Sequence, residues 1–246
     1  MRRIGLQGLA YFLALAALST HAGGAGQMSI SPEEALKRAA AAEEELKASE
    51  RAYTYRQEIL VQAIGEAGSI SGQYYRVSEI VYDDLGNRKE KIIEFPPSRL
   101  TNLLGVMKPD FKSLLGVEPF FLTPGSLSEY AIRFVERQRL DEINTFAYDV
   151  EPAPKAAATK RKQGDARPFK GRIWIEDQEF QMVKAEGRAF TNKDDREMFP
   201  KFEYYREYLW LPSYVYADDI LEFKRYDVPL RMKIKYTGYK RVASGR

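Results

Sequence analysis

Cysteine and histidine are almost missing from this chain of 246 residues, and their scarcity excludes several chemistries. Without cysteine there are no disulfides, no thiolate catalysis, no cysteine-ligated metal and no lipidated cysteine of the kind that anchors bacterial lipoproteins. The single histidine is His21, which lies in a segment that we expect to be removed. The remaining chain then has no imidazole, so Ser-His-Asp catalysis, Cys-His catalysis and histidine-based zinc sites are excluded. We expect no metal site.

An excess of either charge is also lacking. The formal net charge is +3, and removing Arg2 and Arg3 from the 38 basic residues leaves 36 against 35 acidic ones. A mixed surface that is nearly neutral argues against a nucleic-acid partner.

The familiar signatures of enzymes are missing as well. We find no glycine-rich phosphate loop, no G-x-G-x-x-G turn between a strand and a helix, and no G-x-S-x-G elbow. The sequence therefore predicts a protein that is not an enzyme and that has no cofactor. A Ser-Lys or carboxylate pair brought together by folding would make it a hydrolase, and this alternative stays open.

Only one long apolar run is present, and it lies at the N-terminus. Arg2 and Arg3 precede a run from Leu9 to Leu18 in which every residue is apolar, and small residues follow it. This pattern is typical of a secretory signal peptide, whereas a membrane-spanning helix needs about 20 apolar residues. We expect a signal peptide over residues 1–22, cleavage near Ala22, export to the periplasm, and a single domain over residues 23–246. An uncleaved anchor or a buried helix is the alternative.

A helix is expected within residues 27–51. Ser31 can cap free N–H groups, Pro32 suits the first turn and Glu34 completes a capping box, so the helix should run from Pro32 to about Arg51. Its apolar stripe is thin and rich in alanine, which predicts a helix that covers the rest of the fold.

From Tyr53 onward the apolar residues recur with a period of two, which indicates strands buried on one face. Short turns such as 84–87 and 141–144 favour hairpins and an antiparallel sheet. The apolar segment that follows Pro96 and Pro97, as far as Leu122, should form one or two short helices over the sheet. The loop 152–168 is basic and should be mobile. The expected strands begin at Tyr53 and continue at residues 73–82, 88–95, 130–140, 145–151, 169–176, 181–190, 203–211, 214–217 and 230–239.

Three pairs of adjacent aspartates were considered as catalytic or metal-binding groups. Neighbouring side chains on a strand point to opposite faces, so such a pair does not share a proton. Asp83-Asp84 and Asp194-Asp195 lie in turn-like sequences, where aspartate is common. A functional role stays open for Asp218-Asp219.

Aromatic residues are abundant, with 16 Tyr, 13 Phe and 2 Trp. They can fill the core of a sheet, or they can line an apolar hollow in a curved sheet beneath the covering helices. We predict the second arrangement, with these residues as the ligand-binding lining: Tyr53, Tyr55, Tyr75, Val77, Phe134, Tyr148, Ile173, Ile175, Met232 and Ile234.

The order of elements and several motifs resemble the superfamily of the lipoprotein carriers LolA and LolB, to which the envelope stress sensor RseB is similar. The motifs are F-K-G-R-I-W-I-E at 169–176, M-V-K-A-E-G at 182–187, W-L-P-S-Y at 210–214 and K-Y-T-G-Y-K at 235–240. The last two, with Asp218-Asp219, resemble an outer-membrane lipoprotein-sorting branch of that superfamily.

This resemblance implies a mainly β fold of the α+β kind, in which a curved antiparallel sheet forms an incomplete β-barrel with helices over its mouth. It also implies an apolar cavity for acyl chains, no cofactor, and an arginine that bonds the lid, for which Arg56 is the candidate. The function predicted is a periplasmic carrier of lipid or lipoprotein acyl chains, acting in outer-membrane lipoprotein sorting. The alternative is an RseB-like sensor that contacts an envelope membrane protein.

Overall fold

The computed structural model of the chain describes residues 30–100, 122–158, 168–190, 197–198, 201–223 and 227–242. Met1–Ile30 is a separate unit from Ser31–Arg246, to which all the elements belong. The helices and short 3-10 turns are α1 (Pro32–Glu50), η1 (Glu66–Gly68), η2 (Leu127–Glu129), α4 (Pro154–Ala158) and η3 (Tyr208–Trp210). The strands are β1 (Tyr53–Ile64), β2 (Ile70–Tyr82), β3 (Arg88–Glu94), β4 (Tyr130–Leu140), β5 (Ile143–Pro152), β6 (Phe169–Glu176), β7 (Met182–Ala189), β8 (Glu197–Met198), β9 (Phe202–Arg206), β10 (Pro212–Phe223) and β11 (Asp227–Arg241).

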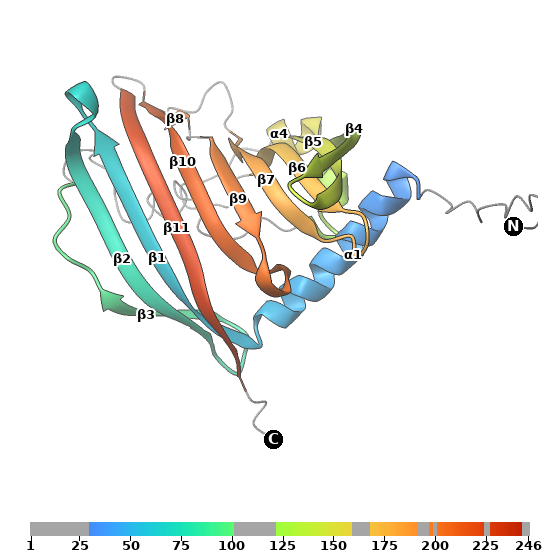
Figure 1. The fold of residues 1–246 in the computed structure, drawn as a ribbon, viewed down its shortest axis with the longest axis horizontal. Coiled ribbons are helices and arrows are strands. Elements are labelled where there is room, and N and C mark those ends of the chain that lie inside the picture. Colours follow the sequence, from blue (N-terminus) through green and yellow to red (C-terminus); the bar gives the residue numbers. More distant parts are fainter. Residues whose placement is uncertain are drawn as a thin grey trace, which may run out of the picture. The chain divides into compact units, whose positions relative to one another are not determined.

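The strands form one antiparallel sheet in the order β3-β2-β1-β11-β10-β9-β7-β6-β5-β4, and the short β8 pairs with β10. The sheet is curved, and α1 runs across it (Figure 1). Its two edges are β3 and β4, so the sheet of the described strands is open. The mainly β fold with a curved antiparallel sheet is therefore confirmed.

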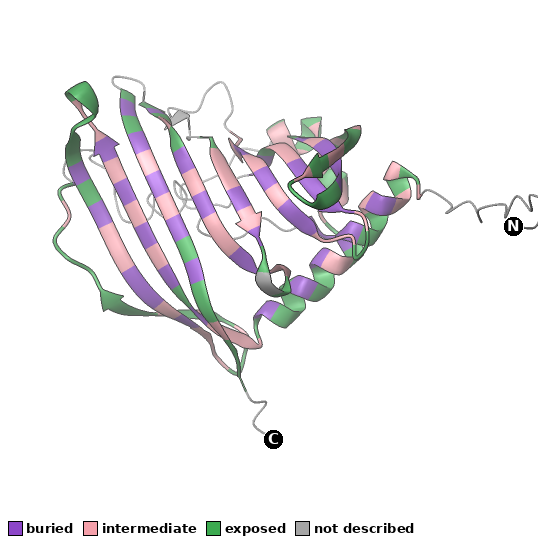
Figure 2. Ribbon diagram, in the orientation of Figure 1, coloured by how far each residue is buried: buried purple, intermediate pink, exposed green. Residues whose placement is uncertain are grey.

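Burial alternates along β1 and β11, as their sequences predict (Figure 2). The last strand shows this most simply, because every second residue from Val228 to Tyr236 is at most 8% exposed. The intervening Arg231 and Lys233 are half-buried and Lys235 is exposed. A period of two thus assigns one face of β11 to the core, as expected.

The helix α1 begins as its sequence predicts. The Ser31 hydroxyl accepts a hydrogen bond from the backbone N–H of Glu34 at 3.1 Å, and Pro32 occupies the first turn. The helix ends at Glu50, one residue before the predicted end. Among its buried residues only Leu46 is a large apolar one, so its apolar stripe is thin.

The hairpin turn between β2 and β3 is held by Asp83. Its carboxylate accepts hydrogen bonds from the backbone N–H groups of Leu85 and Asn87 at 3.1 and 2.8 Å. Gly86 adopts a φ of 76°, which glycine tolerates without strain. The turn-forming role expected for this aspartate pair is thus confirmed at Asp83.

The strand predicted over 203–211 is wrong in its second half. β9 ends at Arg206, and η3 follows, in which Leu209 and Trp210 have positive φ values of 54° and 58°. The chain turns here and returns as β10 from Pro212, because residues in this left-handed region cannot continue a strand.

Several expectations lie wholly or partly outside the described residues. They are the signal peptide, the apolar segment at 101–121 and most of the loop 152–168, of which α4 is the described part. Asp194-Asp195 lies outside as well. Of the helices that the structure describes, none is long and apolar enough to cross a membrane.

Candidate functional site

The register of the sheet aligns apolar and aromatic side chains in a row that crosses eight strands. Residues paired across antiparallel strands share a face, so successive pairs from β4 to β1 can be followed across the sheet. The row consists of Phe134, Tyr148, Ile173, Ala185, Tyr204, Val215, Ile234 and Ile59, and the next partner, on β2, is Arg76.

This row lies on the side of the sheet that carries α1, and we call that side the α1 face. The Tyr148 hydroxyl donates a hydrogen bond to the backbone carbonyl of Pro32 at 2.6 Å. Further along, the Arg206 guanidinium on β9 bonds the Glu43 carboxylate of α1. The helix therefore crosses the α1 face from β5 toward β9 (Figure 1).

Eight of the ten predicted lining residues share the α1 face by register and strand alternation. Phe134 is 36% exposed and Tyr53 is half-buried, whereas the other six are at most 3% exposed. The eight are Tyr53, Tyr55, Phe134, Tyr148, Ile173, Ile175, Met232 and Ile234.

Tyr75 and Val77 lie on the opposite face of the sheet. They stand opposite Leu60 and Glu58, which alternate with the residues of β1 that face α1. Tyr75 is half-buried there, and Val77 is fully buried. The structure therefore does not bring these two residues together with the other eight.

Aromatic rings gather at both ends of the row. At the β4 end, Phe134 lies 5.7 Å from Tyr148 and 6.4 Å from Phe146, measured between ring centroids. At the β1 end, Tyr55 lies 6.0 Å from Tyr236 and 5.1 Å from Tyr239. Our lining omitted Phe146 and Tyr236, although both alternate in phase with residues that it included.

A buried ion pair attaches α1 to the sheet. The side chains of Arg206 and Glu43 are 0% and 2% exposed, and one of their two hydrogen bonds measures 3.0 Å. Burial alone would lower the pKa of the Arg206 guanidinium, but the charge of Glu43 and the nearby Tyr204 raise it above its ordinary value. The Arg206 guanidinium therefore stays charged.

Arg56, the candidate for the arginine that bonds the lid, is not the arginine that bonds α1. Arg56 is exposed, and it alternates with residues of β1 that face α1, so it points away from the helix. Arg206 makes that contact instead. No sequence signal marks it, because its partner Glu43 is 163 residues distant along the chain.

Tyrosine hydroxyls surround the ion pair and the β1 end of the row. Burial raises the pKa of Tyr204 to about 12, and this hydroxyl accepts a hydrogen bond from Arg206 Nε at 3.2 Å. Burial also raises the pKa values of Tyr55 and Tyr236. These phenols therefore remain neutral at physiological pH.

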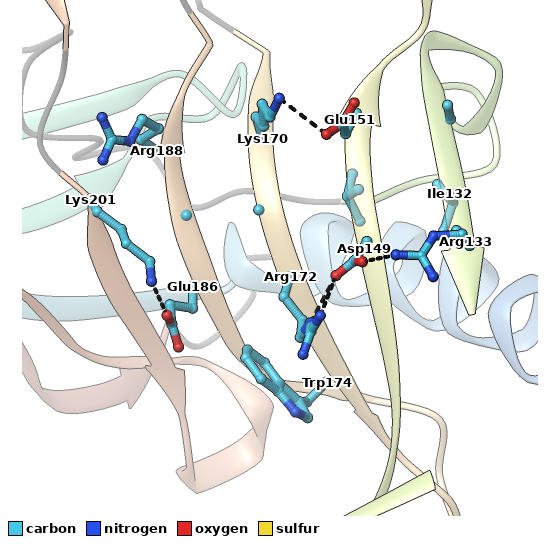
Figure 3. Close-up of a pocket in the computed structure, with 14 residues that line it drawn as sticks. Ile132, Arg133, Asp149, Glu151, Lys170, Arg172, Trp174, Glu186, Arg188 and Lys201 are labelled. Atoms are coloured by element: carbon cyan, nitrogen blue, oxygen red, sulfur yellow. Dashed lines mark hydrogen bonds and ion pairs between the residues drawn. The ribbon is translucent and has the colours of Figure 1, made fainter. Parts of the chain in front are cut away.

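A pocket of about 740 Å³ lies on the face opposite α1 (Figure 3). Arg133, Asp149, Arg172 and Glu186 stand directly opposite one another across β4 to β7, with charges that alternate in sign. Asp149 accepts bonds from both arginines, and Arg172 Nε lies 2.8 Å from its carboxylate. Lys201 bonds Glu186 and lowers the pKa of that carboxyl.

The floor of the pocket contains Gly171 and Gly187, which are paired across β6 and β7. A Cβ atom on Gly171 would lie 2.1 Å from the carbonyl oxygen of Glu186, and one on Gly187 would lie 2.3 Å from that of Lys170. Such contacts are impossible, so this close approach of the strands requires glycine at both positions.

The aspartates at 218 and 219 are engaged by neighbouring donors. Asp218 accepts hydrogen bonds from Arg231 at 3.0 Å and from the Tyr216 hydroxyl at 3.1 Å. Asp219 accepts bonds from the backbone N–H of Lys201 at 2.7 Å and from Arg188 at 3.3 Å. Within the described residues no group of three acidic side chains could hold a metal ion.

No family model matches the sequence, and no curated protein does. Solved structures match it at low identity. A LolA superfamily protein from Nitrosomonas europaea has a TM-score of 0.39 and 11% identity, over 88% of this chain and 96% of its own. A DUF1329 family protein from Desulfovibrio piger has a TM-score of 0.37 and 10% identity, over 87% and 94%. A proposed outer membrane lipoprotein-sorting protein domain from Vibrio parahaemolyticus has a TM-score of 0.35 and 10% identity, over 83% and 95%.

Proposed function

We propose that the protein is a periplasmic carrier that binds a hydrophobic ligand, a lipid or the acyl chains of a lipoprotein, between α1 and the sheet. The observation that carries this proposal is the row of apolar and aromatic side chains on the α1 face. Binding would be by burial of apolar surface, without a reaction and without a cofactor. Export through a signal peptide cleaved near Ala22 is part of the proposal.

The contacts that hold α1 against the sheet support the idea that this helix is a movable cover. Its buried residues include three alanines and one leucine, so the apolar area that it contributes is small. Burying Leu46 stabilises its attachment by about 1.5–3 kcal/mol. Its polar contacts include the Glu43 pair with Arg206 and the Pro32 carbonyl with Tyr148. A ligand that inserts between the helix and the sheet therefore has to offset the loss of these contacts.

An acyl chain can supply that energy. Each methylene removed from water contributes about 0.8 kcal/mol, so a chain of about a dozen methylenes contributes on the order of 10 kcal/mol before the costs of binding. Six of the eight lining residues are at most 3% exposed, so the ligand must enter by displacing what covers them. Phe134, at 36% exposure, is the point of entry at the β4 edge.

The test uses two exposed apolar residues on opposite faces. Phe134→Glu places a charge at the entry of the row, whereas Ile220→Glu places one on the other face, where Ile220 is 44% exposed and paired with Pro229. Binding of palmitate is measured by isothermal titration calorimetry. We expect Phe134→Glu to weaken binding by about tenfold or more, since a charge in an apolar site costs at least several kcal/mol, and Ile220→Glu to leave it unchanged.

Equal effects of the two substitutions, or no effect of Phe134→Glu in a protein that binds palmitate, would place the ligand away from the α1 face. A wild-type protein that binds no palmitate, phospholipid or acylated peptide would contradict the carrier function altogether.

A further inference from the structure

The pocket opposite α1 carries an excess of positive charge that its own carboxylates do not balance. Five cationic and three acidic side chains line it, which gives a formal charge of +2. The lining cations are Arg133, Lys170, Arg172, Arg188 and Lys201, and the carboxylates are Asp149, Glu151 and Glu186. The pocket is remote from the apolar row, because it lies on the other face of the sheet.

Two of these cations form an unfavourable pair. Lys170 and Arg188 stand directly opposite each other on β6 and β7, and like charges in that position destabilise a sheet. Their side chains point apart: Lys170 Nζ lies 3.0 Å from Glu151, and Arg188 lies 3.3 Å from Asp219 (Figure 3). The paired glycines Gly171 and Gly187 lie between this pair and the next pair on the same face, Arg172 and Glu186, and they add no side chain to the floor of the pocket.

We propose that this pocket binds a phosphate group between Lys170 and Arg188, with Arg172 and Lys201 within reach at its rim. A phosphate carries close to two negative charges and three strong acceptor oxygens, so it can bond several cations at once. It would relieve the repulsion between Lys170 and Arg188. The separate contacts of these two side chains with Glu151 and Asp219 relieve it only in part. This charge also lets it compete with the single negative charge of each carboxylate already present.

The phosphate can belong to a free phosphate or phosphate ester, or to a phospholipid headgroup. Both offer the same chemistry to the pocket, and the experiment separates them. The site does not depend on the proposed carrier function, because no residue of the apolar row takes part in it.

Binding of inorganic phosphate to the purified protein is measured by isothermal titration calorimetry. In parallel, the protein is sedimented with vesicles of equimolar phosphatidylglycerol and phosphatidylcholine. Lys170→Gln and Arg188→Gln should each weaken binding by about tenfold or more, since each removes a charge-assisted hydrogen bond. Lys91→Gln is the matched control, because Lys91 forms an exposed ion pair with Glu79 far from the pocket on β3.

A further variant should change binding in the opposite direction. Glu151→Gln removes the carboxylate that competes for Lys170, so it should strengthen phosphate binding. If the ion pair of Lys170 with Glu151 had only a structural role, this substitution would not strengthen binding. All three glutamine variants of the pocket affect side chains that are 34% exposed or more, so far-UV circular dichroism should show an unchanged fold.

Saturable phosphate binding with this pattern of variants supports a free phosphate or ester as the ligand, and binding to vesicles alone with the same pattern supports a headgroup. Binding to neither probe would overturn the proposal. Equal losses in Lys91→Gln and the pocket variants would also overturn it, as would capture of a polyglutamate peptide without any response to phosphate.

Discussion

Replacing Arg206 by methionine should destabilise the protein far more than any exposed ion pair could. The methionine side chain keeps most of the length of arginine but leaves the Glu43 carboxylate buried at 2% exposure without its partner. Removing one member of a buried ion pair costs about 3–5 kcal/mol, because the other charge is left uncompensated. We expect a loss of that size in the free energy of unfolding.

Urea unfolding monitored by tryptophan fluorescence measures this loss. Arg231→Met is the matched control, since Arg231 forms an ion pair with Asp218 in which the two side chains are 41% and 44% exposed. Exposed pairs contribute about 0–1 kcal/mol, so the control should be close to wild type.

A double substitution separates charge from packing. Arg206→Met combined with Glu43→Leu removes both charges and should recover most of the stability, because apolar replacements of buried pairs are often neutral or stabilising. A cost below about 1 kcal/mol for Arg206→Met alone, or a double variant as unstable as the single one, would refute the view that this pair fixes α1 to the sheet.

Three further predictions follow from single contacts. Burial raises the pKa of Tyr204 from its ordinary value of 10.0 to about 12. Its contribution to the free energy of unfolding, about 3 kcal/mol, is therefore complete below pH 10 and is lost as the pH rises through about 12. Urea unfolding at stepped alkaline pH should show this decline, and Tyr204→Phe should reduce it. Gly187→Ala should cost about 3 kcal/mol or more in thermal unfolding, because its Cβ would lie 2.3 Å from a backbone oxygen, whereas Gly125→Ala, with nothing nearer than 4.0 Å, should cost little. Tyr148→Phe should cost about 1 kcal/mol by losing the hydrogen bond to Pro32, and it should speed hydrogen exchange in the first turn of α1.

Local patterns were sufficient to predict the individual elements. Ser31 and Pro32 fixed the start of α1, and the period of two in the last strand identified which of its residues are buried. The break after Arg206 was not predictable, because the aromatic residues that follow it continue the pattern of a strand. Only the positive φ values of Leu209 and Trp210 end the strand there.

The composition of the site depends on registers and distant contacts that a single sequence does not reveal. The sequence of β2 does not show which face of the sheet Tyr75 and Val77 occupy. Their pairing with β1 assigns them to the face opposite α1. Arg206 meets Glu43 across 163 residues, so no local motif connects them. The charged pocket likewise exists only because four strands align Arg133, Asp149, Arg172 and Glu186.

The central claim is that a hydrophobic ligand lies between α1 and the sheet, and native mass spectrometry of the protein purified from its own envelope fraction tests it most directly. We expect an added mass of lipid size that disappears on organic extraction and is absent from Phe134→Glu but present in Ile220→Glu. A bare mass in repeated gentle preparations, with α1 equally protected from hydrogen exchange before and after addition of lipid, would contradict the claim.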